Sequence, residues 1–332
     1  MKKFRIGILG GTGAVGREMI KILNERNFPI KELRLLASSR SAGKIIETPF
    51  GNLEVVEAAD NAFTNLDIVL GAAGNETSKR FAPAINDSGA VYIDNSSAFR
   101  LCDNVPLVIP EINPEDIKKH SGIIANPNCS TIITLVAINA INKLSEINGM
   151  YVSTYQAVSG AGAKGPIERY NQTRAILDKM AFDSSVFQHQ IAFNLIPQIG
   201  SFDNIGYSSE EMKLQNEGRK ILHNPKLKVS CTCVRVPVER SHSISVNVIT
   251  DKKLSIDNIR KAISEEPGCI LTDGDGKVDY PMPISTSNQD KVFVGRIRKD
   301  LVNEHGINLW CCGDQIRKGA ATNAVQIAEL FL

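Results

Sequence analysis

One short segment near the N-terminus limits the folds open to this chain more than any other. The apolar run Phe4–Leu9 has the pattern of a buried strand, and GTGAVG at 11–16 follows it closely, with a helical pattern directly after. A strand, a tight turn and a helix are the context in which G-x-G-x-x-G spacing binds a dinucleotide, because glycines let the backbone approach a pyrophosphate and free helix N–H groups attract it. The alternative is a glycine-rich turn without a ligand. The predicted cofactor contacts here are Gly11, Thr12, Gly13, Ala14, Val15 and Gly16.

The first 130 residues continue this alternation of short β-branched runs and helical patterns, which is typical of a parallel sheet with crossover helices. Helices are expected near 14–27 and 76–87. Strands are expected at Phe4–Leu9, Leu33–Ala37, Asp67–Gly71, Val91–Asp94 and Ile123–Ala125. The region is therefore predicted to be an α/β domain of the Rossmann type.

The pattern changes near Met150, where longer alternating runs such as MYVSTYQAVSG and HSISVNVIT begin. These runs predict a second, α+β domain with a mixed or antiparallel sheet and helices on one side. A final helix is expected over Gln315–Leu332, with Asp314 as its N-cap, packing back on the first domain. The predicted domains are residues 1–128 plus 315–332, and 129–314.

Size and composition exclude several classes of protein. The 332 residues suffice for two domains, and 42% hydrophobic with 22% charged residues is ordinary for a globular protein. A net charge of +2 without a basic run gives no reason to expect nucleic acid or an anionic membrane as a partner. No apolar stretch is long enough to span a membrane or to form a signal-peptide core, so a cytoplasmic location is expected.

The cysteines do not suggest a disulfide framework or a metal site. There are seven, an odd number without a C-x-x-C pair, and they would be reduced in the cytoplasm. No metal is therefore predicted. Cys231 and Cys233 alternate along an apolar run, so they share one face of a strand and are interpreted as small core side chains.

The choice of cofactor depends on the end of the second strand. NAD-binding domains usually place Asp or Glu there, about 20 residues after the glycines, to hold the ribose 2′-hydroxyl. This chain instead has Ser38, Ser39, Arg40 and Ser41, with Lys44 just beyond. Hydroxyls and cations suit a 2′-phosphate, because guanidinium binds phosphate through paired charge-assisted hydrogen bonds. NADP(H) is predicted, the alternative being that Arg40 and Lys44 are only solvated loop charges.

Cys129 is a candidate nucleophile. It lies in the segment NPNCST, between a short strand and the strongly apolar helical run IITLVAINAI, and so at or next to a helix N-terminus. That position favours the thiolate, which is the reactive form of a cysteine. The alternative is a buried small hydrophobic side chain. Together with a dinucleotide domain, such a cysteine suggests an aldehyde dehydrogenase that works through a thioester.

Several segments, in one order along the chain, resemble the bacterial NADPH-dependent branch of the aspartate-β-semialdehyde dehydrogenase family over essentially the full length. They are GTGAVGRE (11–18), ASSRSAGK (37–44), IDNSSAFR (93–100), ANPNCST (125–131), YQAVSGAG (155–162), AFNLIPQIG (192–200), SSEEMKLQNEGRKIL (208–222), RVPVERSHS (235–243) and RKGAATNAVQIAEL (317–330). The resemblance implies reversible conversion of L-aspartyl-4-phosphate and NADPH to L-aspartate-4-semialdehyde, NADP and phosphate, towards lysine, methionine, threonine and, in many bacteria, diaminopimelate. It also implies that 129–314 is the catalytic and dimerisation domain of a homodimer, sometimes paired into a tetramer.

The resemblance implies a role for each matching residue. Cys129 would attack the acyl phosphate, His242 would be the general acid/base for the thiol and the hemithioacetal oxygen, and Gln156 would orient the substrate. The other implied contacts are Arg235 to the substrate carboxylate, Glu210 to its ammonium group, Lys213, Arg100 and Asn128 to the phosphate, and Ser159, Gly160 and Gln315 to the cofactor. From the residues alone, His242 is as readily a core or turn histidine, Arg235 a strand-edge salt bridge, and Glu210 with Lys213 a surface ion pair.

The chain departs from the family at two positions near the implied cofactor. Gln315 stands where the family usually has Asn beside the nicotinamide, and Gly313 replaces a commoner serine. Two other functions stay open. One is an N-acetyl-glutamyl-phosphate reductase, whose acylated substrate amine needs no carboxylate at Glu210. The other is a catalytically silent paralogue retained for partner binding.

Overall fold

The computed structural model describes residues 2–273 and 279–332. Contacts divide the chain into two units, Met1–Asn128 with Gly319–Leu332, and Cys129–Lys318. The functional division drawn from the sequence, with the cofactor on one domain and catalysis on the other, stays a proposal. Among the described residues, no helix has both the length and the hydrophobicity needed to cross a bilayer.

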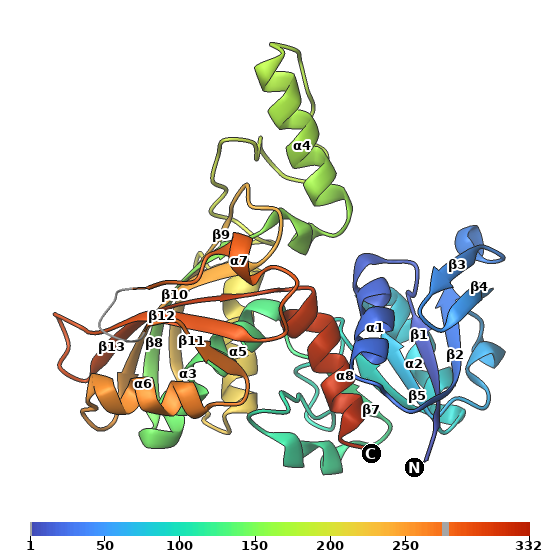
Figure 1. Ribbon diagram of the computed structural model, residues 1–332, viewed down its shortest axis with the longest axis horizontal. Helices are drawn as coiled ribbons and strands as arrows, with labels where there is room; N and C mark the ends of the chain where they lie inside the picture. Colours follow the sequence, from blue (N-terminus) through green and yellow to red (C-terminus); the bar gives the residue numbers. More distant parts are fainter. Residues whose placement is uncertain (1, 274–278) are drawn as a thin grey trace. The chain divides into compact units, whose positions relative to one another are not determined.

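The first unit is built on a seven-stranded sheet with the order β3-β4-β2-β1-β5-β6-β7 (Figure 1). Only β3 runs antiparallel to its neighbour, so the predicted parallel α/β sheet is confirmed. The strands are β1 (Phe4–Leu9), β2 (Ile30–Ala37), β3 (Ile45–Thr48), β4 (Gly51–Glu57), β5 (Ile68–Gly71), β6 (Val91–Asp94) and β7 (Ile123–Ala125). The sequence pattern does not predict β3 or β4. In β4 only Val55 is buried, which leaves no hydrophobic period to recognise.

Helices cover both faces of this sheet. Helices α1 (Ala14–Glu25) and α8 (Thr322–Glu329) share a hydrophobic core with Ile68 of β5, whereas α2 (Asn75–Asp87) packs in a second core with Val69. Successive residues of the strand therefore point to opposite cores. The short 3₁₀ turns Ser39–Ser41, Asp60–Phe63 and Pro114–Lys119 complete this unit.

The C-terminal segment differs from the single helix predicted over 315–332. Asp314 Oδ1 accepts hydrogen bonds from the backbone N–H groups of Ile316 and Arg317 (2.9 and 3.0 Å), so Asp314 does cap the segment. A π-helical turn, Arg317–Ala321, comes first, and α8 begins only at Thr322. Arg317 also donates twice to Asp290, a contact distant in sequence that the local pattern could not show.

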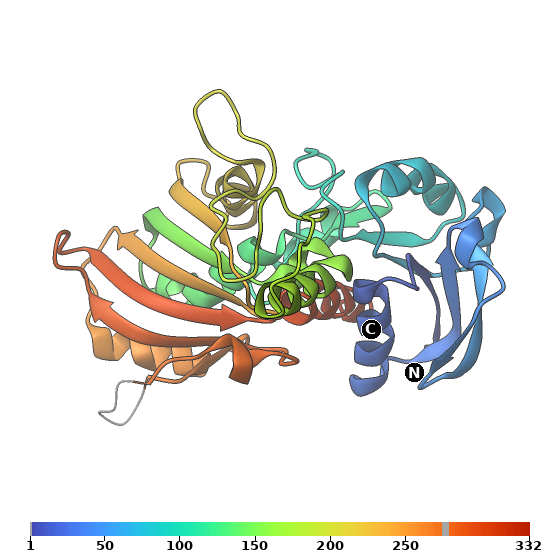
Figure 2. The same ribbon diagram turned by 90° about the horizontal axis from the view of Figure 1, so that it is seen from above.

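The second unit contains a six-stranded mixed sheet with the order β11-β12-β13-β10-β8-β9 (Figure 2). The β8/β9 and β11/β12 pairs are parallel and the other three are antiparallel. The strands are β8 (Ile147–Gln156), β9 (Lys228–Arg235), β10 (His242–Thr250), β11 (Cys269–Leu271), β12 (Val292–Lys299) and β13 (Gly306–Gly313). Cys231 and Cys233 are buried, as predicted.

Helices α3 (Cys129–Leu144), α5 (Ser209–Ile221) and α6 (Ile256–Glu265) pack on this sheet, and the predicted α+β class is confirmed (Figure 1). The opposite face is more open. Tyr151 of β8 is 62% exposed, and the rings of Tyr155 and Trp310 lie 5.6 Å apart. The short helix α7 (Pro283–Thr286) contacts β13.

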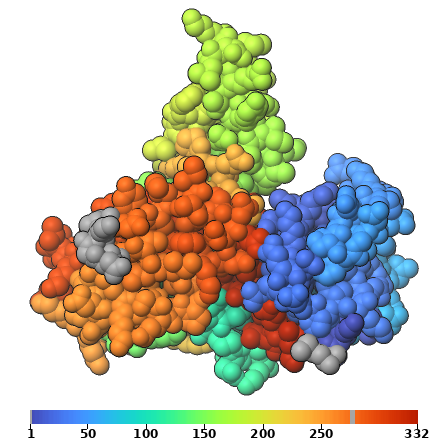
Figure 3. Space-filling view, in the orientation of Figure 1, coloured from blue at the N-terminus to red at the C-terminus, as the bar shows by residue number. Residues whose placement is uncertain are grey.

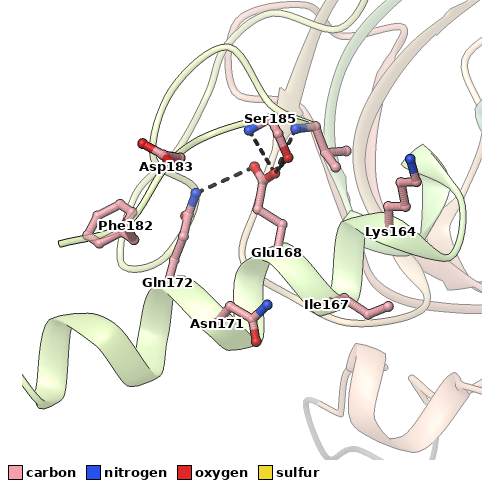
Figure 4. A pocket seen from close by; sticks show the side chains of 9 residues that line it. Lys164, Ile167, Glu168, Asn171, Gln172, Phe182, Asp183 and Ser185 are labelled. Atoms are coloured by element: carbon pink, nitrogen blue, oxygen red, sulfur yellow. Dashed lines mark hydrogen bonds between the residues drawn. The ribbon is translucent and has the colours of Figure 1, made fainter. Parts of the chain in front are cut away.

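Helix α4 (Lys164–Leu177) and the loop after it stand away from this sheet (Figures 1 and 3). Two buried side chains of the helix hold the loop: Glu168 accepts the backbone N–H groups of Ser185, Val186 and Phe187, and Gln172 accepts those of Ile191 and Ala192. A pocket of about 430 Å³ lies between helix and loop (Figure 4). None of the site residues predicted from the sequence lines it.

Candidate active site

The glycine segment forms the turn between β1 and α1. The residue with a left-handed backbone is Gly10 (φ +89°), one position before the predicted segment, and a Cβ there would lie 2.8 Å from the carbonyl oxygen of Ala72. A Cβ at Gly16 would overlap the carbonyl oxygen of Gly10, so helix and strand pack as closely as the motif predicts. Gly13 precedes α1 and has no side chain to cap the first amides of the helix, which therefore can meet an anion.

A pocket of about 470 Å³ opens beside this turn, at the carboxyl ends of β1, β2 and β5. Ligands of open parallel sheets bind at this edge, where the strand order reverses. Four predicted cofactor residues line the pocket: Thr12, Gly13, Ser38 and Ser39. The lining that the sequence analysis missed includes Gly10, Glu57, Ala72, Ala73, Thr77 and Phe81.

The other predicted cofactor residues of the first unit lie around this pocket without lining it: Gly11, Ala14, Val15, Gly16, Arg40 and Ser41. Arg40 and Ser41 form the 3₁₀ turn that follows β2. Arg40 is exposed and makes no ion pair within the part of the chain that the structure describes. Close backbone approach, uncapped helix amides, hydroxyls and an available cation together fit a dinucleotide with a 2′-phosphate.

The second unit brings the predicted nucleophile and its histidine together. Cys129 is the first residue of α3 and is partly exposed, while His242 is the first residue of β10 and is fully buried. Cys129 Sγ lies 3.6 Å from His242 Nε2, although the two residues are 113 positions apart in the sequence. At the start of a helix the sulfur also lies where the partial positive charge favours a thiolate.

The backbone determines which nitrogen of His242 carries a proton. The N–H of Ala157 donates to Nδ1 (3.1 Å), so Nδ1 must present a lone pair. A neutral ring then has its proton on Nε2, which faces Cys129 Sγ and, at 3.4 Å, the amide nitrogen of Gln156. Of these two atoms only the sulfur can accept a hydrogen bond. The ring is therefore oriented to donate to the sulfur, or to an oxygen bound beside it.

Burial keeps this histidine uncharged. Desolvation lowers the pKa of His242 to about 3, and the positive charge of Arg235 acts in the same direction, while Glu210 opposes both. At neutral pH the imidazole is therefore a neutral hydrogen-bond donor. The alternative of an idle core histidine does not explain why its donor nitrogen faces a partly exposed thiol.

Gln156, Glu210 and Lys213 form a continuous hydrogen-bonded chain beside this pair. Gln156 Nε2 donates to Glu210 Oε1 (3.2 Å), and Lys213 Nζ donates to Glu210 Oε2 (2.9 Å). Thr154 Oγ1 donates to Gln156 Oε1 (3.0 Å), which fixes the orientation of the amide. The side chain of Glu210 is only 8% exposed, so this ion pair, which the spacing alone would place on the surface, has a buried carboxylate.

The next residue, Glu211, has a different task that the sequence analysis missed. It closes a capping box with Ser208 at the start of α5 and accepts the backbone N–H of Cys233 in β9 (2.8 Å). The S-x-x-E spacing of Ser208 and Glu211 was the available signal. The capping box fixes the first turn of α5, and with it the position of Glu210.

Arg235 is buried at the end of β9. Its Nη1 donates to the carbonyl oxygen of Ala157 (2.7 Å), and it pairs with no carboxylate in the described part of the chain. Burial lowers the pKa of Arg235, and the charges of Glu210 and Cys129 oppose that effect. A buried guanidinium without a carboxylate of its own suits a carboxylate supplied by a ligand.

Arg100 and Asn128 belong to the first unit, and both are buried. Arg100 Nε donates to the carbonyl oxygen of Asn126 (2.9 Å), and Nη2 donates to that of Asn95 (2.8 Å). These bonds tie the guanidinium to the NPNC segment that leads into Cys129.

Ser159 and Gly160 lie in the 3₁₀ turn Val158–Ala161, directly after β8. A Cβ at Gly160 would lie 2.8 Å from Arg235 Nη1 and 3.3 Å from His242 Cε1, so the missing side chain makes room for both groups. Gln315 reaches the same turn, with Nε2 donating to Ser159 Oγ (2.5 Å).

Comparisons with family models, with relatives and with solved structures all match this chain to semialdehyde dehydrogenases. Residues 5–120 match the semialdehyde dehydrogenase NAD-binding domain, and residues 138–318 match the semialdehyde dehydrogenase dimerisation domain. The chain is 51% identical to the aspartate-semialdehyde dehydrogenase of Aquifex aeolicus, covering 99% of this chain and 98% of the relative, and 46% identical to that of Bacillus subtilis (98% and 96%). It superposes with a TM-score of 0.97 on the crystal structure of aspartate semialdehyde dehydrogenase II complexed with ASA from Vibrio cholerae. That protein is 43% identical, with 100% of this chain and 98% of the other covered.

Proposed function

This chain belongs to the aspartate-semialdehyde dehydrogenase family, and we propose on that basis that it converts L-aspartyl-4-phosphate and NADPH reversibly to L-aspartate-4-semialdehyde, NADP and phosphate. The predicted family and enzyme class are confirmed by these relatives, and the match to an NAD-binding domain supports a nicotinamide dinucleotide as the cofactor. The step belongs to the biosynthesis of lysine, methionine and threonine. The observation that carries the proposal for the site is the 3.6 Å approach of Cys129 Sγ to His242 Nε2.

The first half of the proposed reaction forms a thioester. The thiolate of Cys129 attacks the C4 carbonyl carbon of the acyl phosphate, a carbon–sulfur bond forms, and the carbon–oxygen bond to phosphate breaks. The carbonyl oxygen becomes negatively charged on the way, and the Nε2–H of His242 is oriented to donate a hydrogen bond to it. In its reactive state the pair consists of a thiolate at Cys129 and a neutral imidazole at His242. Because Nδ1 accepts from the N–H of Ala157, the single proton of this imidazole is on Nε2.

The second half reduces the thioester. When bound, NADPH would be the source of the hydride that the thioester carbon accepts. His242 again donates to the resulting oxyanion, which collapses to the aldehyde as the carbon–sulfur bond breaks and the thiolate of Cys129 returns. The resemblance implies that His242 serves both the thiol of Cys129 and the hemithioacetal oxygen. A neutral ring with its proton on Nε2 favours donation to the oxygen over removal of a proton from the thiol.

We propose that the charged groups around the pair recognise the ends of the substrate. Arg235 binds the carboxylate through its fork of donors, and Glu210 binds the ammonium group. Lys213, with a side chain 31% exposed, lies beside Glu210 and binds the phosphate. The family resemblance alone assigns further phosphate contacts to Arg100 and Asn128 of the first unit, and it assigns to Gln156 the orientation of the acyl group near the sulfur. Support comes from the burial of Arg235 and Glu210 and from the hydrogen bonds that fix them.

The family to which the chain belongs carries a dimerisation domain, and the chain acts as a homodimer on a small molecule. We propose that the open face of the six-stranded sheet, which exposes Tyr151 and Tyr155, forms the dimer contact, and that pairs of dimers form tetramers. A cytoplasmic location is also proposed, since a thiolate nucleophile needs a reducing compartment.

The direct test follows NADPH absorbance with aspartate semialdehyde, phosphate and NADP. The expected result is NADPH formation that requires all three, with a much lower rate when NAD replaces NADP. Equal rates with both cofactors would contradict the role proposed for Ser38 to Ser41.

Two controls address the other functions. N-acetyl-glutamate semialdehyde should give no comparable rate, because the buried carboxylate of Glu210 suits a free ammonium group and the relatives do not favour that activity. A catalytically silent protein would bind NADP without turnover on either aldehyde.

A further inference from the structure

Gln315 joins the two segments of chain that hold His242 in place. We propose that it is a positioning residue for the Cys129–His242 pair, in addition to the cofactor contact that the family resemblance implies for it. The proposal builds on the function proposed above. It rests on a hydrogen-bond pattern entirely within the second unit.

The first segment is the residue directly before the histidine. Ser241 has a left-handed backbone (φ +71°), which residues other than glycine rarely adopt. It is completely buried, and two hydrogen bonds hold it: its N–H donates to Gln315 Oε1 (2.9 Å), and its hydroxyl pairs with Thr286 Oγ1 (2.7 Å). An unfavourable backbone that persists next to a reactive group needs such restraints.

The second segment is the 3₁₀ turn after β8. Gln315 Nε2 donates to Ser159 Oγ (2.5 Å), and the backbone N–H of Ser159 donates to the carbonyl oxygen of Glu239 (3.2 Å). Ser159 lies two residues after Ala157, whose N–H determines the tautomer of His242. One amide side chain, that of Gln315, therefore restrains both the backbone entering His242 and the turn that supplies its Nδ1 partner.

Removing the side-chain amide of Gln315 should change the reactivity of Cys129 Sγ even in the protein without bound cofactor. Without Gln315, Ser241 can relax towards ordinary backbone angles, and both the ring position and the Ala157 bond change with it. The Nε2–H then no longer aims at Cys129 Sγ. A thiolate that loses a hydrogen-bond donor is less stable, so its pKa rises and its reactivity at neutral pH falls.

The experiment measures alkylation of Cys129 by iodoacetamide in the full-length protein, without cofactor or substrate, between pH 5 and 9. Mass spectrometry of the Cys129 peptide separates it from Cys102, the exposed cysteine. Gln315→Ala should raise the apparent pKa of the reaction by about one unit and lower the rate at pH 7 about tenfold. His242→Ala should do the same, and the double variant should add little, since both changes remove one restraint.

Two further variants separate the ends of the amide. Gln315→Glu keeps an acceptor for Ser241 but cannot donate to Ser159, and Ser159→Ala removes the other partner, so each should give part of the shift. Combining Gln315→Ala with Ser241→Gly should restore much of the reactivity, because glycine adopts φ +71° without strain. That rescue is not expected if Gln315 only supports folding.

The matched control is Gln326→Ala in the first unit, whose amide donates to Glu111, and it should alkylate like the wild type. If Gln315→Ala folds, alkylates like the wild type and loses only NADP affinity, the positioning role is wrong and a cofactor contact alone remains. If the alkylation shift is found but aspartate semialdehyde is not oxidised, the proposed function fails and the positioning role stands.

Discussion

The glycine turn of the first unit and the side-chain cluster of the second are built from different groups. The side-chain cluster consists of Cys129, Gln156, Arg235, Glu210, Lys213 and His242. The turn uses backbone from one continuous stretch, with Gly10, Gly13 and Gly16 keeping side chains away. The cluster uses side chains from α3, α5, β8 and β10 that are hydrogen-bonded to one another, and Arg235 of β9 beside them is bonded to the backbone of Ala157. A site of backbone groups is damaged mainly by added volume, whereas a site of linked side chains is damaged by removing any one partner.

The largest expected effect is the loss of the nucleophile. Cys129→Ser should lower turnover at least about 10³-fold, because a serine hydroxyl beside a neutral imidazole with no free base nitrogen is hardly ionised. Binding of NADP and thermal unfolding should be unchanged, since the glycine turn does not depend on this side chain. Steady-state turnover measures the loss of activity, and isothermal titration with NADP and a thermal melt measure binding and stability. Wild-type activity in this variant would eliminate Cys129 as the nucleophile.

A second contrast lies between two acid–base pairs of equal spacing. Glu210→Gln should lower kcat/KM about 10²-fold, because it removes a buried charge that both Gln156 and Lys213 contact. The pair Glu115 and Lys118 has the same i,i+3 spacing but is exposed, with side chains 78% and 75% accessible. Glu115→Gln should therefore change neither activity nor stability measurably. Equal effects of Glu210→Gln and Glu115→Gln on kcat/KM would mean that the burial of Glu210 does not matter for activity.

The same contrast explains what sequence reasoning could predict. The glycine motif is local, so strand, turn and helix were predictable from neighbouring residues, and β1, β6 and β7 have the predicted bounds. Cys129 also carries a local signal, its place at a helix start. His242 carries none, because its partners come from Ala157 and Cys129, 85 and 113 positions away in the sequence. Only the family resemblance selected it.

Other details were missed for related reasons. Gly10 is the left-handed residue of the turn, although the motif begins at Gly11, because spacing alone does not report backbone angles. Glu57 lines the pocket from β4, an exposed strand without a hydrophobic period. The link from Gln315 to Ser241 joins positions 74 apart, which no local pattern can show.

Added volume should damage the first unit selectively. In Gly16→Ala the new Cβ would overlap the Gly10 carbonyl oxygen and approach Gly11 Cα, both backbone atoms, so α1 must shift from β1. We expect a loss of about 2 kcal/mol in stability and weaker NADP binding, with alkylation of Cys129 unchanged. Gly74→Ala is the control, because Gly74 precedes α2 and has open space around its Cβ position. Urea unfolding and NADP titration of both variants decide the point, and similar losses in the two would contradict the packing argument.

The smallest effect concerns pH and tests the side-chain cluster alone. His242 has a pKa of about 3 in the folded protein, below the value of about 6.5 expected in the unfolded chain, so below pH 6.5 only the unfolded chain takes up this proton. The contribution of the neutral His242 ring to the free energy of unfolding is therefore complete above pH 6.5 and is lost as the pH falls towards 3. Between pH 6.5 and 5.5 the wild type should lose about 1 kcal/mol more stability than His242→Gln, which cannot be protonated. Urea midpoints at the two pH values measure the difference, with the exposed His189→Gln variant expected to follow the wild type. A wild type that follows His242→Gln instead would show that the buried ring gains its proton as readily as the unfolded chain does, and the neutral donor on which the oxyanion contact depends would be lost.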